Sequence, residues 1–152
     1  MDYEQYEKEC DEVRKENDKY LNLFEEDLRS SGLKDATIRR HIKNTSFYIN
    51  IFLLRERIIP AEDGIYELDM YFGEFFIRHC AWSTPGTIKT SAASLKKFYK
   101  CMSNHGFVSA NDYGALCHEI KISMPYWQDL CEQFNDPYAP NPFNPFSYFG
   151  GL

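Results

Sequence analysis

The chain has 152 residues, a length typical of a single domain with its own core. Hydrophobic residues make up 43% of it and aromatic residues 16%, which predicts a packed globular body and argues against disorder. No apolar run is long enough to span a bilayer, and the opening MDYEQYEKEC is unlike a signal peptide. Five widely spaced cysteines without a CxxC pair predict reduced thiols, so we expect a cytoplasmic protein.

The formal net charge of -6 is an average over alternating blocks. Residues 1–28, 58–77 and 109–152 are acidic, with net charges of -7, -5 and -4. Residues 29–57 and 78–108 each carry +5, and the second of these blocks contains no Asp or Glu. A sequence pI near 5.2 argues against nucleic-acid binding, but binding depends on the local field at a surface. The two basic blocks therefore keep DNA binding open.

The first predicted element is a long helix over residues 2–30, with Gly32 as the C′ residue that ends it. Its apolar seam consists of Tyr3, Tyr6, Cys10, Val13, Tyr20, Phe24 and Leu28. Asn17 interrupts this seam, and two interpretations stay open. Asn17 sets the register of a coiled coil, or the helix packs on its own domain and Asn17 sits at a solvated gap.

A second helix is predicted over residues 36–54, with Asp35 as its N-cap. Its buried stripe comprises Ile38, Ile42, Thr45, Ile49 and Phe52. Pro60 and the AEDG that follows predict a loop. A third, strongly apolar helix is expected over residues 68–80.

The fourth predicted helix has clear boundaries, because Thr84 is a good N-cap, Pro85 suits the first position and Gly106 stands just past the end. One stripe is apolar: Ile88, Ala92, Leu95, Tyr99 and Met102. A second stripe, about 110° around the helix, contains Lys89, Ala93, Lys96 and Lys100, with Lys97 beside it. This pattern predicts an exposed basic ridge.

Beyond Val108, Ser109 is expected to cap a helix that runs to about Ile122, and Pro125 to open another that runs to Phe134. Residues 1–135 are thus predicted to form one helical domain. Residues 136–152 are rich in proline and aromatic residues, and they form either a disordered tail or an arm docked in an apolar groove. We favour the docked arm.

Residues 18–111 resemble the N-terminal core-binding domain of tyrosine recombinases and phage integrases. The matching motifs are Gly-Leu-x-x-x-Thr-Ile at residues 32–38, Thr-Ile followed by Ser-Leu-Lys-x-Phe-Tyr-Lys at residues 87–100, and Gly-Phe-Val-x-x-Asn at residues 106–111. The resemblance implies an all-α fold, a compact SAM-like bundle of two crossed helix hairpins. Here it would carry an acidic N-terminal helical extension and extra C-terminal helices.

The chain departs from the family's pattern in ways that bear on catalysis. Asp112 follows Asn111 where the family usually has a proline, and the large catalytic domain is missing. No arginine occurs after Arg78, so the arginine pair that clamps the scissile phosphate in the family has no counterpart. We therefore expect a protein that is not an enzyme.

The resemblance implies that the second and fourth helices face double-stranded DNA, and these are the helices that the sequence keeps basic. Lysine and arginine supply phosphate contacts, and short polar side chains can reach base edges. The candidate DNA-binding residues are Arg39, Arg40, Lys43, Asn44, Thr87, Lys89, Thr90, Ser94, Lys96, Lys97 and Lys100.

The alternative function is a helical interaction module that binds a protein partner, or a second copy of the chain, by pairing acidic and basic surfaces without DNA. The two functions differ in whether residues 1–28 lie against the basic residues of the second and fourth predicted helices. His79–Cys80 and Cys117–His118 are adjacent pairs that chelate poorly on a helix, so no metal site is expected. Glycine-rich phosphate loops are absent, and no cofactor is expected.

Overall fold

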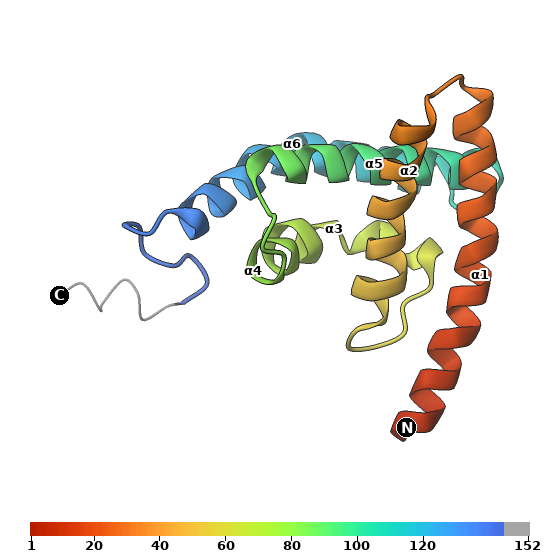
Figure 1. Ribbon diagram of the computed structural model, residues 1–152, viewed down its shortest axis with the longest axis horizontal. Helices are drawn as coiled ribbons and strands as arrows, with labels where there is room; N and C mark the ends of the chain where they lie inside the picture. The colour runs from red at the N-terminus through yellow and green to blue at the C-terminus, as the bar shows by residue number, and fades with distance from the viewer. Residues whose placement is uncertain (145–152) are drawn as a thin grey trace.

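The computed structural model describes residues 1–144 as an all-helical bundle in which two helix hairpins cross (Figure 1). The first hairpin consists of α1 (Tyr3–Ser30) and α2 (Asp35–Ser46), and the second of α5 (Pro85–Asn104) and α6 (Ala110–Asn135). Short helical segments between α2 and α5 fill the angle between the hairpins. The described part of the chain has no β-strand, as the sequence predicted.

The turn of the first hairpin depends on Gly32, which has a φ of 81° at the predicted C′ position. The Leu33 amide donates to the Leu28 carbonyl at 3.4 Å, which satisfies one of the free carbonyls at the end of α1. Asp35 was predicted as the N-cap of α2, but it is the first helical residue and Lys34 precedes it as the cap. The Asp35 carboxylate instead accepts a hydrogen bond from Arg29 at 2.7 Å, and its charge suits the positive end of the helix dipole.

Asn17 decides between the two interpretations of α1. The residue is 1% exposed, and its side-chain amide donates to the Ile49 carbonyl at 3.2 Å and to Asn50 Oδ1 at 2.8 Å. The helix therefore packs on its own domain, and no partner chain is needed to bury Asn17. The prediction that Asn17 sits at a solvated gap is wrong, because its amide donates to the backbone of the helical segment after α2.

The chain stays helical after α2 as far as Leu54, but the hydrogen-bond pattern changes. Residues Phe47–Ile51 form a π-helical turn (η1) and residues Phe52–Leu54 a 3₁₀ turn (η2). The expected apolar stripe faces inward, with Ile42 half-buried and its other members buried. The predicted second helix is correct in extent, and only its first twelve residues are regular α-helix.

The expected loop after Pro60 is a 3₁₀ helix, η3 (Ala61–Tyr66), which is bound by one side chain from η1 and one from α5. The Tyr48 hydroxyl donates to the Gly64 carbonyl, and the Tyr99 hydroxyl donates to the Ala61 carbonyl at 2.7 Å. A Cβ atom on Gly64 would lie 2.5 Å from Leu53 Cδ1 and from the Tyr99 hydroxyl. Only glycine fits this approach.

The third predicted helix is correct in extent but consists of three short segments. These are α3 (Leu68–Met70), the π-helical η4 (Tyr71–Phe75) and α4 (Phe76–His79). Tyr71 and Phe72 are fully buried between the hairpins. Helix α5 follows the sequence prediction closely: Thr84 and Thr87 form a reciprocal capping box, and Gly106 ends the helix with a φ of 82°.

Helix α6 is continuous over 26 residues, so the prediction of two helices separated before Pro125 is wrong. An interior proline costs about 3 kcal/mol because it removes one hydrogen bond and crowds the preceding turn. Buried residues on both sides of Pro125 offset this cost: Leu116 before it, and Trp127 and Cys131 after it. The Trp127 indole N–H also donates to Asp69 Oδ1 at 2.8 Å.

The first part of the C-terminal arm lies against the bundle. The Phe143 ring is 5.8 Å from the ring of Phe134 on α6, and the Arg78 guanidinium lies 5.4 Å from the Phe143 ring centre. Gln133 donates to the Pro140 carbonyl at 2.8 Å. Tyr138, in contrast, is 95% exposed. The rest of the predicted arm, residues 145–152, lies outside the described residues.

Candidate nucleic-acid interface

The basic residues of α2 share its outer side. Arg39, Arg40 and Lys43 are exposed, whereas Ile38 and Thr45 are buried. At about 100° per residue, the three basic positions lie within one 100° arc. The arc lies roughly opposite the buried stripe. The sequence of α2 therefore directs three positive charges to solvent while it buries an apolar stripe.

The lysines of α5 are also exposed, as predicted from their spacing. The apolar stripe, about 110° around the helix from them, is completely buried, and every member of it has an exposed fraction of 0%. The resulting ridge contains Lys89, Lys96, Lys97 and Lys100. We call these four lysines, together with Arg39, Arg40 and Lys43, the basic face.

A buried polar contact joins α2 to α5. His41 Nδ1 lies 2.8 Å from the Ser94 hydroxyl, and the Asn44 amide donates to the same hydroxyl at 3.0 Å. Burial lowers the pKa of His41, and the positive charges of Arg40 and Lys97 lower it further. Arg40 from α2 and Lys97 from α5 thus both act on one imidazole. A positive charge from each helix therefore lies near this contact.

Several of the polar residues predicted to contact DNA are instead buried or engaged in contacts within the protein. Ser94 has an exposed fraction of 0%, so it is not available to contact DNA. Asn44 is half-buried, and its amide is bound to Ser94. The Thr87 hydroxyl belongs to the capping box, where it accepts from the Thr84 amide at 2.8 Å. Among the polar candidates Thr90 alone is exposed, and its hydroxyl donates to the Thr87 carbonyl at 3.2 Å.

The basic face has no acidic partner within the described part of the chain, since none of the ion pairs among residues 1–144 includes one of its seven members. Lys100 does contact an aromatic ring, with its ammonium 5.2 Å from the ring centre of Tyr113. Where acids of α1 form ion pairs, most of their partners also lie in α1, as in Asp11 with Arg14 and Glu16 with Lys19. The seven positive charges are therefore not neutralised by neighbouring carboxylates.

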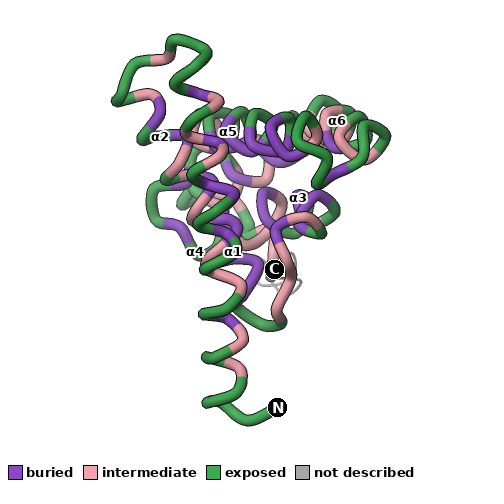
Figure 2. Tube along the Cα trace, turned by 90° about the vertical axis from the view of Figure 1, so that its right-hand side faces the viewer, coloured by how far each residue is buried: buried purple, intermediate pink, exposed green. Residues whose placement is uncertain are grey.

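Helix α1 leaves most of the basic face uncovered. Its N-terminal half extends beyond the bundle (Figures 1 and 2), and among residues 3–16 only Cys10 is buried. The acids of α1 that border a groove beside the basic face are Glu25 and Asp27, both near its C-terminal end. The N-terminal half of α1, which holds six of the ten acids of the helix, therefore points away from α5.

Two grooves border the basic face. The first, of about 910 Å³, runs along α2 and brings Arg40 and Lys43 next to Phe47, Ile51 and Trp82. Trp82 is 55% exposed, and its ring lies 5.7 Å from that of Phe47. The second groove, of about 710 Å³, lies between the C-terminal ends of α1 and α5. Its lining includes Asp27, His105, Tyr113 and three lysines of the ridge, Lys96, Lys97 and Lys100.

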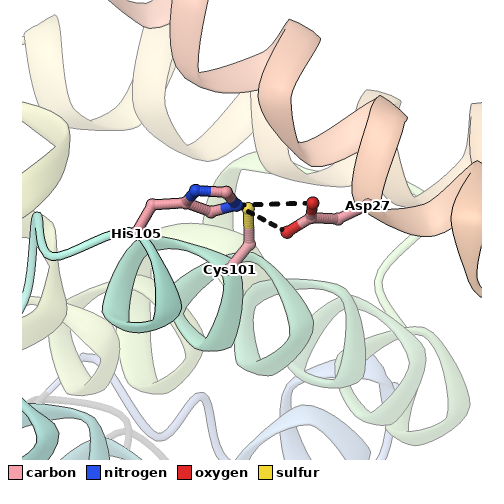
Figure 3. A group of neighbouring side chains, drawn as sticks. All are labelled: Asp27, Cys101 and His105. Atoms are coloured by element: carbon pink, nitrogen blue, oxygen red, sulfur yellow. Dashed lines mark hydrogen bonds and ion pairs between the residues drawn. The ribbon is translucent and has the colours of Figure 1, made fainter.

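The aromatic edge at Phe47 and Trp82 was missed by the sequence analysis. Trp82 stands in a short connection between α4 and α5, where no helical periodicity indicates that its side chain is exposed beside α2. A second missed feature is the group of Asp27, Cys101 and His105 in the second groove (Figure 3). The spacing of Cys101 and His105 on a predicted helix was a usable signal, but Asp27 lies 74 residues away from Cys101 in the sequence.

No helix within residues 1–144 combines the length and the apolar character that crossing a membrane requires. Comparisons with protein-family models, with curated proteins and with solved structures found no match for this chain. The resemblance to the core-binding domain of tyrosine recombinases therefore stays a prediction from the motifs at residues 32–38, 87–100 and 106–111.

Proposed function

We propose that the protein binds double-stranded DNA through the basic face and carries out no chemistry on it. The observation that carries the proposal is the set of seven exposed lysines and arginines on two adjoining helices, none of them in an ion pair with a described acid. Such residues bind phosphates and release counterions, which supplies most of the affinity in non-specific binding.

Three further observations support the proposal. The chain folds as an all-α bundle, as the recombinase resemblance implies, and α2 and α5 are the helices that the resemblance would turn toward DNA, although the second hairpin pairs α5 with α6, which lies almost entirely beyond the resembling residues 18–111. Residues 79–152 contain no arginine, so this segment does not supply the arginine pair with which the family clamps a scissile phosphate. The five cysteines are all free, which fits a reducing compartment, and we place the protein in the cytoplasm.

Fluorescence anisotropy with labelled duplex and branched DNA, at about 50 and 200 mM salt, tests the proposal. Each phosphate contact contributes a slope of about 0.9 to the log–log salt dependence, so Lys89→Glu/Lys96→Glu is expected to flatten the slope by about 1.8. The matched control is Lys8→Glu/Lys15→Glu, which changes the net charge equally on the exposed outer half of α1. Equal effects of both pairs would show that only net charge matters.

The second candidate function is protein binding through α1. The outer half of this helix projects from the bundle, carries most of its acids and presents Tyr3 with 75% of its surface exposed. Absence of DNA binding at low salt, for the natural chain and for Glu4→Gln/Glu7→Gln/Asp11→Asn, would overturn the DNA proposal. Light scattering at increasing concentration would then test whether the partner is a second copy of the chain.

A further inference from the structure

Three side chains of different chemistry converge where α1 and α5 end. Asp27 lies in the last turn of α1, Cys101 in the last turn of α5, and His105 at the C-cap of α5 (Figure 3). His105 Nε2 is 3.1 Å from Asp27 Oδ2 and 3.3 Å from Asp27 Oδ1. One carboxylate oxygen, one imidazole nitrogen and the Cys101 sulfur all lie within 4.8 Å of one another.

These donors match the ligands and the spacing of a tetrahedral transition-metal site. Zinc binds thiolate at about 2.3 Å and imidazole or carboxylate at about 2.0–2.2 Å, so its ligand atoms lie about 3.3–3.8 Å apart. The observed separations start at 3.1 Å and do not exceed 4.8 Å. Reducing the largest separation to the distance between zinc ligands needs movements of only about 1 Å.

The backbone prepares the site in two ways. Cys101 and His105 are four residues apart, so they project from the same side of α5. The C-terminal ends of α1 and α5 both lie at the site, and the partial negative charge of a helix C-terminus favours a cation. Lys96, Lys97 and Lys100 line the same groove and oppose this attraction. A mixed thiolate and carboxylate ligand set supplies two formal negative charges that offset them.

Access is also suitable for an ion that enters from solvent. Cys101 is 4% exposed, whereas the side chains of Asp27 and His105 are 39% and 37% exposed at the rim of the groove. The sulfur therefore forms the floor of the site, and the other two donors border its opening. Three protein ligands leave the fourth tetrahedral position open to water.

We propose that Asp27, Cys101 and His105 bind one divalent transition-metal ion of the zinc class and thereby join the end of α1 to the end of α5. Binding releases the proton of the Cys101 thiol to solvent and leaves the single ring proton of neutral His105 on Nδ1, so that Nε2 is free to bind the metal. The hydrogen bond between His105 and Asp27 is thereby replaced with two metal–ligand bonds. The inference is independent of DNA binding, because none of the three residues belongs to the basic face.

Cobalt(II) titration of the reduced full-length chain, followed by absorption spectroscopy, tests the proposal. We expect a thiolate-to-cobalt charge-transfer band and tetrahedral d–d bands that saturate at one ion per chain and disappear when zinc is added. The variants are Cys101→Ser, His105→Gln and Asp27→Asn. Cys101→Ser should abolish the charge-transfer band, and the other two should weaken binding at least tenfold.

Cys117→Ser is the matched control, because Cys117 is the more exposed thiol and lies outside the site. This variant should bind cobalt like the natural chain. Zinc should raise the Tm of the natural chain and of Cys117→Ser, and leave that of Asp27→Asn and His105→Gln nearly unchanged. Absence of a charge-transfer band, or a band that survives in Cys101→Ser, overturns the proposal. Should Cys101→Ser not fold, the two rim variants decide the question, and unchanged cobalt binding in both of them also overturns it.

Discussion

The two faces of α5 share one backbone, but different constraints act on them. On the inner face, Leu95 and Tyr99 have no exposed surface and belong to the hydrophobic core. On the outer face, Lys96 and Lys100 lie in solvent without a carboxylate partner among the described residues. Substitutions on the inner face should therefore change the free energy of unfolding, and substitutions on the outer face should change affinity for a ligand. Ser94 lies between the two faces, so its substitution tests whether this position contributes to stability or to ligand binding.

The largest effect on stability is expected for Leu95→Ala. The substitution leaves a cavity in the core between the hairpins, and such changes cost about 2–5 kcal/mol. Urea unfolding followed by circular dichroism measures the loss. Ala93→Ser, on the exposed side of the same helix, is the control and should change the unfolding free energy by less than about 0.5 kcal/mol. Similar losses in both variants would contradict the separation of the two faces.

Ser94→Ala is expected to cost about 1–3 kcal/mol, because it leaves the buried His41 ring and the Asn44 amide without their shared partner. The same unfolding assay applies, with Thr90→Ala as the control, since Thr90 is exposed one turn away. An unchanged free energy of unfolding in Ser94→Ala would show that water replaces the hydroxyl, and Ser94 would then have to be assigned to the outer face.

The stability of the protein should depend on pH because of His41. Burial and the charges of Arg40 and Lys97 lower its pKa in the folded protein, so below about pH 6.5 the unfolded chain takes up a proton that the folded one does not. Stability should therefore fall as the pH decreases from about 7 to 5.5. Melting curves across this range measure the slope. His41→Gln should flatten it, and an unchanged slope would assign the dependence to other groups.

The smallest effect on stability is expected for Lys89→Glu/Lys96→Glu. Both lysines are exposed and form no ion pair with the described acids. The free energy of unfolding should therefore change by less than about 0.5 kcal/mol, as is typical of surface substitutions, and the Tm should change little. Thermal unfolding beside the anisotropy titration gives both quantities from one preparation. A marked loss of stability would mean that reduced DNA binding by this variant reports on folding.

Elements whose signals are local were predictable from the sequence. Thr84, Pro85 and Gly106 set the ends of α5, and the alternation of apolar and basic positions separated its two faces. Helix α6 was misjudged at Pro125, because the contacts that keep the helix continuous come from Trp127 and its distant partner Asp69. Local propensity indicates a break there, and tertiary packing overrides it.

The candidate interface was predictable in its charges and less so in its polar residues. A lysine that recurs along one helix face lies in solvent in almost any packing arrangement, so its exposure follows from spacing. Ser94 gave no such signal. A small hydroxyl side chain fits both a surface and a core, and its partner His41 lies 53 residues earlier in the sequence. A separation of 74 residues likewise hides the approach of Asp27 to Cys101.

The projection of α1 separates charge over the length of the molecule. Residues 3–16 span about 20 Å at 1.5 Å per residue, a distance of about two Debye lengths at 0.1 M salt. The acids near the N-terminus and the basic face near α5 therefore act as two separate poles. In the field of a polyanion this dipole experiences a torque before contact, which turns the basic pole forward and the acidic helix outward. Orientation would thus begin during diffusion, and it would weaken as salt shortens the range of the field.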